Sequence, residues 1–168
     1  WKMDGGVICQ QAYHHIDILS NLFPQIISIY AEKYNLTNKL EAEDTFSALG
    51  KLKDGSTFNF EATTGMRPSD HEASIIVYGT NGYIEVGGVA INEIKRFKLN
   101  NNVINNFKKY NQKFKTGYGT SHKIVFEEVA QKIQKKNFKS LNNPHEVEKI
   151  ICYIHNFYKS SESEKKIV

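Results

Sequence analysis

The first seventeen residues combine side chains that could bind a hydroxylated ligand and move its proton. Gln10, His14 and Asp17 stand at positions i, i+4 and i+7 of a segment with helical periodicity, which would place them on one helix face. Histidine titrates near neutral pH and can accept a proton, whereas a carboxamide orients a hydroxyl without carrying charge. Gly5-Gly6 precedes the segment and would let backbone approach a ligand closely.

A second face of the same segment is apolar and predicts the side that packs on a core. Ala12, Ile16, Leu19 and Phe23 follow at helical spacing. His15 lies beside this stripe, and we expect it to be structural. An isolated helical histidine is more often a surface or core residue than a catalyst. We prefer His14 because Gln10 and the glycine pair accompany it. The alternative role for Asp17 is to complete a hydrogen-bond network, with no part in the reaction.

The segment from Trp1 to Asp17 resembles the substrate-side motif of the Gfo/Idh/MocA oxidoreductases. In that family a Gly-Gly stretch leads into Asp, Asn or Gln, then three residues, His, two residues and Asp. The resemblance implies that His14 lies near the carbon that loses hydride and that Gln10 assists there. The substrate contacts that we expect from it are Lys2, Asp4, Gly5, Gly6, Gln11 and Asp17. The Lys2 ammonium could pair with an anionic group of the substrate. The alternative interpretation is that Lys2 is an exposed surface lysine without a substrate contact.

The form Trp1-Lys2-x-Asp4-Gly5-Gly6 with Gln10-Gln11 is most similar to the branch that oxidises nucleotide-linked N-acetyl sugars for surface polysaccharides. The resemblance implies the substrate-binding domain of an NAD(P)-dependent oxidoreductase that acts on a sugar hydroxyl. A different class stays open as the alternative, a non-catalytic sugar-binding or dimerisation module with the same fold.

The cofactor, NAD or NADP, is expected to bind mainly to an N-terminal Rossmann domain absent from this chain. The sequence has no Gly-x-Gly-x-x-Gly that follows a strand, and no Glu-Lys-Pro motif, which supplies a catalytic lysine in the family. The chain starts without Met and inside a motif, which suggests the trailing part of a longer protein. We therefore expect this chain alone to be inactive, and we treat residues 1–168 as one C-terminal domain for substrate binding and oligomerisation.

The middle of the chain reads as a run of strands rather than an alternation of strands and helices. Alternating residues predict hairpins over 45–52 and 57–64, across Asp54-Gly55, and over 73–78 and 83–86, across Asn81-Gly82. Further strands are expected over 25–34 and 93–99, and a short one at the C-terminus. This order favours an α+β fold built on a large, mostly antiparallel sheet. The family resemblance adds that helices pack on one sheet face and that the open face forms a homo-oligomer.

Two later helices are predicted by apolar stripes. Val125, Val129 and Ile133 mark the first, which Ser121 can cap, and Val147, Ile151, Ile154 and Tyr158 mark the second, which begins at Asn143-Pro144. The polar stretch 100–120 between sheet and helices reads as a long loop. From it Tyr118, and His122 just after it, could reach substrate. The alternative for Tyr118 is an aromatic residue that packs on the sheet. The alternative for His122 is a surface histidine in the first turn of the helix.

Composition excludes several function classes. The net charge of +4 is scattered, and Arg67 and Arg96 are the two arginines, so nucleic-acid binding is not expected. No apolar run approaches a membrane span. Two distant cysteines favour reduced thiols and a cytoplasmic location. We expect no metal site: His71 has acidic neighbours, but adjacent residues in a strand point to opposite faces.

Overall fold

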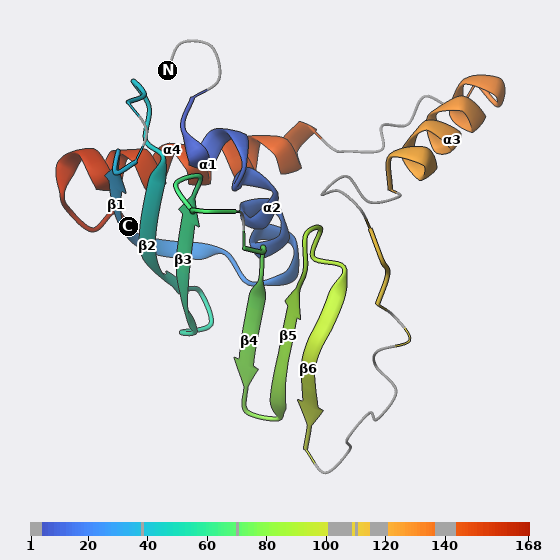
Figure 1. Ribbon diagram of the computed structural model, residues 1–168, viewed down its shortest axis with the longest axis horizontal. Helices are drawn as coiled ribbons and strands as arrows, with labels where there is room; N and C mark the ends of the chain where they lie inside the picture. The colour runs from blue at the N-terminus through green and yellow to red at the C-terminus, as the bar shows by residue number, and fades with distance from the viewer. Residues whose placement is uncertain are drawn as a thin grey trace. The chain divides into compact units, whose positions relative to one another are not determined.

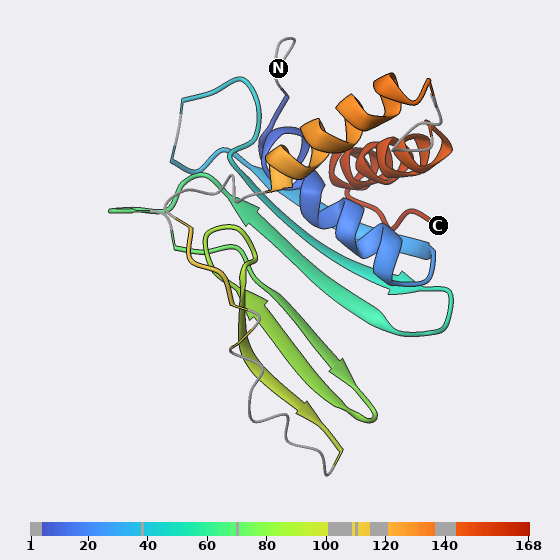
Figure 2. The same cartoon turned by 90° about the vertical axis from the view of Figure 1, so that its right-hand side faces the viewer.

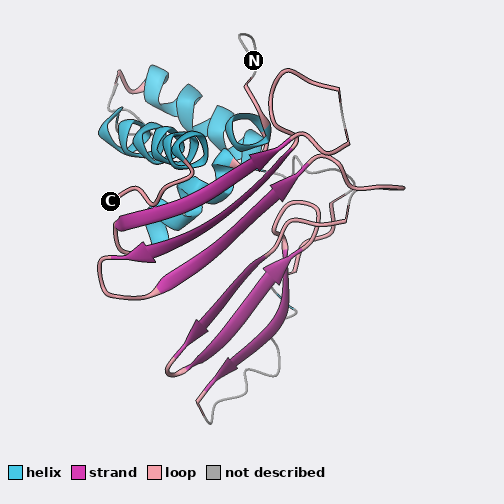
Figure 3. Cartoon of the chain, turned by 90° about the vertical axis from the view of Figure 1, so that its left-hand side faces the viewer, coloured by secondary structure: helices cyan, strands magenta, loops and turns pink. Residues whose placement is uncertain are grey.

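Six strands of the described residues form two antiparallel sheets of three strands each (Figures 1 and 3). The computed structural model describes residues 5–37, 39–69, 71–100, 109, 111–114, 121–136 and 144–168. The chain divides into two compact units, Trp1–Pro68 with Ser140–Val168, and Ser69–Lys139. The predicted α+β class with antiparallel strands is confirmed. The six strands are divided between two separate sheets.

The first sheet has the order β1-β2-β3, with β1 at Ile26–Tyr34, β2 at Thr45–Leu52 and β3 at Thr57–Thr63. The hairpin predicted across Asp54-Gly55 joins β2 to β3. Along β2, alternate side chains are buried, namely Phe46, Ala48 and Leu52, because successive strand residues point to opposite faces. This face of the hairpin is therefore the one that meets the core.

Three helices lie on the inward side of this sheet: α1 (Val7–Gln10) and α4 (Pro144–Ser163), which contact its strands, and α2 (Tyr13–Leu22), which packs on α4. Figure 2 shows α2, in blue, and α4, in red, on the same side of the strands. Phe46 and Phe157 are fully buried and meet edge to face, with ring centroids 5.9 Å apart, a favoured aromatic geometry. Ile8 and Ile16 complete this core from α1 and α2.

The buried face of α4 differs from the predicted stripe. Val147 and Ile151 are exposed, whereas Tyr153, Phe157 and Tyr158 are buried. The helix carries two adjacent apolar stripes, and the one richer in aromatic residues removes more apolar surface from water. The prediction was therefore wrong for the first two positions and right for Tyr158. After α4, Ile167 pairs with Ile29 of β1 in a single antiparallel bridge, where a short C-terminal strand was predicted.

The second unit contains β4 (Ile75–Gly79), β5 (Gly82–Gly87), β6 (Glu93–Leu99) and α3 (Ser121–Gln134). The sheet order is β4-β5-β6, with the predicted hairpin between β4 and β5. The stripe predicted as the core face of α3 is exposed, at 49% for Val125 and 60% for Ile133. That prediction was wrong because no α3 side chain is buried by the described part of the chain.

No helix in the described residues is long and apolar enough to cross a membrane.

Candidate functional site

The predicted site segment contains two helices joined by a corner. The amides of Gln11 and Ala12 both donate to the carbonyl oxygen of Val7, at 3.0 and 2.9 Å, which ends α1. Gln10 is thus the last residue of α1, and His14 lies in the first turn of α2. The prediction that Gln10 shares one helix face with His14 and Asp17 was wrong. Ile8 before the corner, and Ala12 and Ile16 after it, are all buried.

The candidate catalytic side chains are open to solvent in this chain. Gln10, Gln11 and His14 are exposed, and the His14 ring lies on the Tyr13 ring with centroids 3.8 Å apart. Asp17 is half-buried, and its Oδ1 accepts a 2.7 Å hydrogen bond from Asn21 Nδ2. Exposure leaves His14 and Gln10 free to meet a ligand, whereas Asp17 has the network contact considered as its alternative role.

His15 faces away from the open surface, as expected for a structural residue. It is half-buried, and burial, followed by the nearby charge of His14, lowers its pKa below the ordinary histidine value. Its neutral form is therefore favoured in the folded chain. Of the two adjacent histidines, His14 is the one placed to exchange protons with a ligand.

The glycine pair has a structural explanation inside the chain. Gly5 has a positive φ of +69°, a conformation that glycine adopts at little cost. Gly6 is buried and has an ordinary φ of −97°. A Cβ on Gly6 would lie 1.9 to 2.0 Å from the carboxylate atoms of Glu43. The second glycine therefore makes room for a carboxylate of the chain itself.

Glu43 is the residue of this region to which the sequence analysis gave no role. It is 7% exposed, and its Oε1 accepts hydrogen bonds from the Ile8 amide, at 3.3 Å, and from the Tyr158 hydroxyl, at 2.7 Å. Burial, then hydrogen bonding to Cys9 and Glu43, raises the pKa of Tyr158, which keeps this hydroxyl protonated as a donor. The signal in the sequence was the adjacent pair Glu43-Asp44 at the start of a strand.

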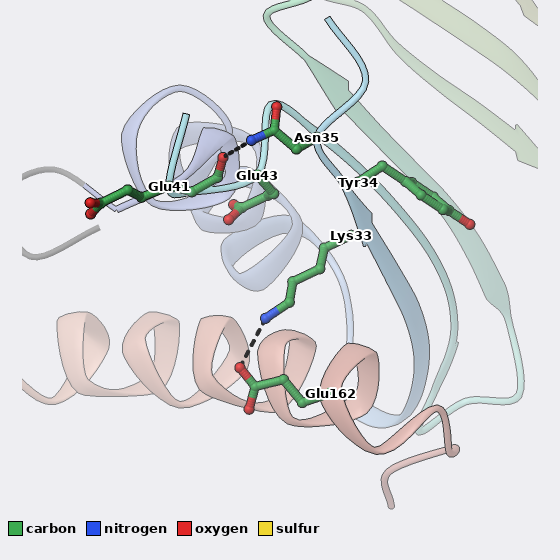
Figure 4. Close-up of a pocket in the computed structure, with 7 residues that line it drawn as sticks. Lys33, Tyr34, Asn35, Glu41, Glu43 and Glu162 are labelled. Atoms are coloured by element: carbon green, nitrogen blue, oxygen red, sulfur yellow. Dashed lines mark hydrogen bonds and ion pairs between the residues drawn. The ribbon is translucent and has the colours of Figure 1, made fainter. Parts of the chain in front are cut away.

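A shallow pocket of about 450 Å³ opens beside Glu43 (Figure 4). Its walls are Lys33, Tyr34, Asn35, Glu41, Ala42, Glu43 and Glu162. The Lys33 ammonium lies 2.9 Å from a Glu162 carboxylate oxygen, and Asn35 donates to the Ala42 carbonyl oxygen at 3.2 Å. These polar groups are engaged with one another, so the pocket supplies no recognisable reaction centre. Among the described residues no three acidic, histidine or cysteine side chains gather around a metal position.

Four of the predicted substrate contacts are not part of this segment as the structure describes it. Lys2, Asp4 and Tyr118 are outside the described residues. His122 is exposed on α3, which belongs to the second unit. The structure thus groups Gly5, Gly6, Gln10, Gln11, His14 and Asp17 in one segment of the first unit.

The described glycines do not form a cradle for a dinucleotide. Gly79 and Gly82 are opposite each other at the β4-β5 turn, and a Cβ on Gly82 would lie 2.0 Å from the carbonyl oxygen of Lys98. Gly82 is therefore required by sheet packing. The described residues do not fit the pyrophosphate of NAD, for which a strand, a glycine turn and a helix N-terminus are needed.

Comparison with known proteins places the chain in a family. The model of the oxidoreductase family C-terminal alpha/beta domain, GFO_IDH_MocA_C, matches residues 1–168. No curated protein sequence matches.

Two solved structures are similar over 99% of this chain. One is the WlbA dehydrogenase from Bordetella pertussis in complex with NADH and UDP-GlcNAcA, with 27% identity and a TM-score of 0.87. The other is the WlbA dehydrogenase from Chromobacterium violaceum with the same two ligands, with 26% identity and a TM-score of 0.84. The chain spans about half of each, 49% and 47%.

A levoglucosan dehydrogenase complexed with NADH and levoglucosan shares the fold at 14% identity and a TM-score of 0.73, over 97% of this chain and 50% of its own. The family match over the whole chain is what decides membership. This chain belongs to the Gfo/Idh/MocA oxidoreductase family and corresponds to its C-terminal α/β domain.

Proposed function

We propose that the chain is the substrate-binding domain of a cytoplasmic, NAD(P)-dependent dehydrogenase that oxidises a hydroxyl of a nucleotide-linked amino sugar or its uronate. The observation that carries this proposal is the exposed side chain of His14. It lies in the first turn of α2, in the segment that follows Gly5-Gly6, in a chain that belongs to a family of oxidoreductases. The two similar WlbA structures, with NADH and UDP-GlcNAcA bound, support a nucleotide sugar as the substrate class.

Oxidation of a sugar hydroxyl removes a hydride from carbon and a proton from oxygen. NAD(P), which we expect to be held by residues outside this chain, would supply the hydride acceptor when bound. His14 accepts or relays the hydroxyl proton, because imidazole exchanges protons near neutral pH. Gln10 orients the hydroxyl by hydrogen bonding. The substrate contacts that the family resemblance implies, at Lys2, Asp4, Gly5, Gly6, Gln11, Asp17, Tyr118 and His122, belong to this proposal.

The test is turnover by the full-length protein. We expect reduction of NAD⁺ or NADP⁺, followed by absorbance of the reduced nicotinamide, when UDP-GlcNAcA is added. His14→Ala should lower kcat by about 100-fold or more, the size of a general-base contribution. His155→Ala is the matched control, because His155 is an exposed histidine of α4. Equal turnover by His14→Ala and the wild type would contradict the assignment.

The competing function is a sugar-binding or dimerisation module without redox chemistry. It predicts saturable protection of residues 5–14 from hydrogen exchange by UDP-GlcNAcA but no reduction of either nicotinamide cofactor. Observation of both protection and turnover supports the dehydrogenase.

We further propose that the domain forms a homo-oligomer through the sheet face opposite the helices. Tyr30 and Leu49 are directly opposite each other on β1 and β2 and are 39% and 57% exposed. Exposed apolar patches mark protein interfaces, and this pair is the apolar part of that face on which the proposal rests.

A further inference from the structure

Glu43 joins three segments that are far apart in the sequence. Its main-chain oxygen accepts the Val7 amide at 3.0 Å, and its side-chain Oε1 accepts the Ile8 amide at 3.3 Å. The first two residues of α1 are thus held by one glutamate, which immediately precedes Asp44 and β2. The third segment is α4, whose Tyr158 donates to the same Oε1.

The surroundings of this carboxylate leave little freedom. Gly6 packs against it so closely that a methyl group in place of the glycine hydrogen would overlap it. The Tyr158 hydroxyl also lies 3.5 Å from Cys9 Sγ, which places a third residue of α1 at the junction. Buried polar groups held by several hydrogen bonds specify one arrangement of the backbone, because each alternative leaves a group unpaired.

The junction lies next to the residues of the proposed chemistry. Gln10 follows Ile8 by two residues in the same short helix, and the corner at Gln11 and Ala12 connects this helix to His14. A helix of four residues has too few internal hydrogen bonds to hold its own geometry, so its direction depends on its packing and on Glu43.

We propose that Glu43 is a positioning residue, which holds α1 so that Gln10 and His14 face the sugar hydroxyl in the productive geometry. The proposal rests on the proposed function. Glu43 itself is buried and does not touch substrate. Its effect comes through the orientation of the two exposed side chains, for which a displacement of about 1 Å can lower the rate by about 100-fold.

Asp44 provides a matched control. It is 1% exposed, and its oxygens accept the amides of Leu36 and Thr37, both at 2.9 Å. It is as buried as Glu43, but these bonds organise the turn after β1 rather than α1. Asp44→Ala should therefore destabilise the fold while leaving the kinetics of the folded enzyme unchanged.

The experiment compares variants of the full-length protein by steady-state kinetics with UDP-GlcNAcA. We expect Glu43→Ala to lower kcat by about 10- to 100-fold, with the KM for the nicotinamide cofactor changed by less than about 2-fold. Glu43→Gln should recover most of the rate, because one accepting oxygen is enough for both hydrogen bonds. Glu43→Asp, which keeps the charge but withdraws the oxygens, should behave like Glu43→Ala and decides the matter if Glu43→Ala does not fold.

Hydrogen exchange separates this proposal from the proposed function, since it needs no turnover. The amides of residues 7–10 should exchange about 10-fold faster or more in Glu43→Ala or Glu43→Asp, and not in Asp44→Ala. Unchanged exchange of residues 7–10 would overturn the role of Glu43, whether or not the protein oxidises a sugar. Equal kcat losses in the Glu43 and Asp44 variants would also overturn it, because they would indicate a general loss of stability.

Discussion

The hydroxyl of Tyr158 donates a 2.7 Å hydrogen bond to Oε1 of Glu43, a residue 115 positions earlier in the chain. Tyr158 is 8% exposed and Glu43 is 7% exposed, so neither group can replace this bond easily by one to water. The bond ties the C-terminal helix α4 to the segment that begins β2 and, through Glu43, to the start of α1.

Tyr158→Phe should lower the free energy of unfolding by about 1–3 kcal/mol, the cost of leaving a buried acceptor without one of its donors. Urea unfolding followed by circular dichroism measures this change. Tyr30→Phe is the control, because Tyr30 is on the open sheet face and its hydroxyl bonds the exposed Glu32. A loss in Tyr158→Phe no larger than in Tyr30→Phe would show that the buried bond contributes little.

Gly6→Ala should destabilise the chain by about 1–3 kcal/mol through overpacking against the Glu43 carboxylate. The φ of Gly6 is accessible to alanine, so the backbone contributes no strain of its own. Because the clash is specific to Glu43, the double variant Gly6→Ala/Glu43→Ala should be more stable than the sum of the single changes predicts. A coupling of at least about 0.5 kcal/mol in this double-mutant cycle is expected, and strictly additive losses would contradict the contact.

Strands were the part of the fold best predicted from sequence. The expected bounds 45–52 and 93–99 coincide with β2 and β6. Each of the two hairpins had a turn signal, Asp54-Gly55 or Asn81-Gly82, between alternating residues. These features are local, because the alternation of side chains along each strand and the turn residues between the strands lie within about twenty residues of sequence.

Long-range packing was less accessible to the sequence analysis. The break after Gln10 is not signalled locally, because the buried residues Ile8, Ala12 and Ile16 on either side of it keep the spacing of one continuous helix face. The choice of the buried face of α4 depends on Phe157 meeting Phe46 across the core. The role of Glu43 could not be predicted because its partner Tyr158 is 115 residues away in the sequence.

The open face of the first sheet should be required for oligomer formation. Leu49→Lys places a charge opposite Tyr30, where it would be buried in an interface at high cost. We expect the molar mass of the full-length protein, measured by light scattering after gel filtration, to fall to that of the monomer. Ile151→Lys is the control, since Ile151 is 60% exposed on α4 and lies away from this sheet face. An unchanged mass for Leu49→Lys would exclude this face as the interface.

His15 should make stability depend on pH in the weakly acidic range. Its pKa in the folded chain lies below the ordinary value of 6.5, chiefly because of burial. The unfolded chain therefore binds a proton that the folded chain does not, so the free energy of unfolding rises with pH in this range. The stabilisation is fully present above about pH 6.5, and it is lost as pH falls from there through the lower folded pKa.

The variant His15→Gln removes this titration while keeping a polar side chain. The wild type should lose more stability than His15→Gln between about pH 7 and pH 5 in urea unfolding, because one proton-linked equilibrium is missing from the variant. The other histidines are common to wild type and variant, so their contributions cancel in the comparison. Equal pH dependence of the wild type and His15→Gln would mean that His15 titrates alike in the folded and unfolded chains, contrary to its partial burial.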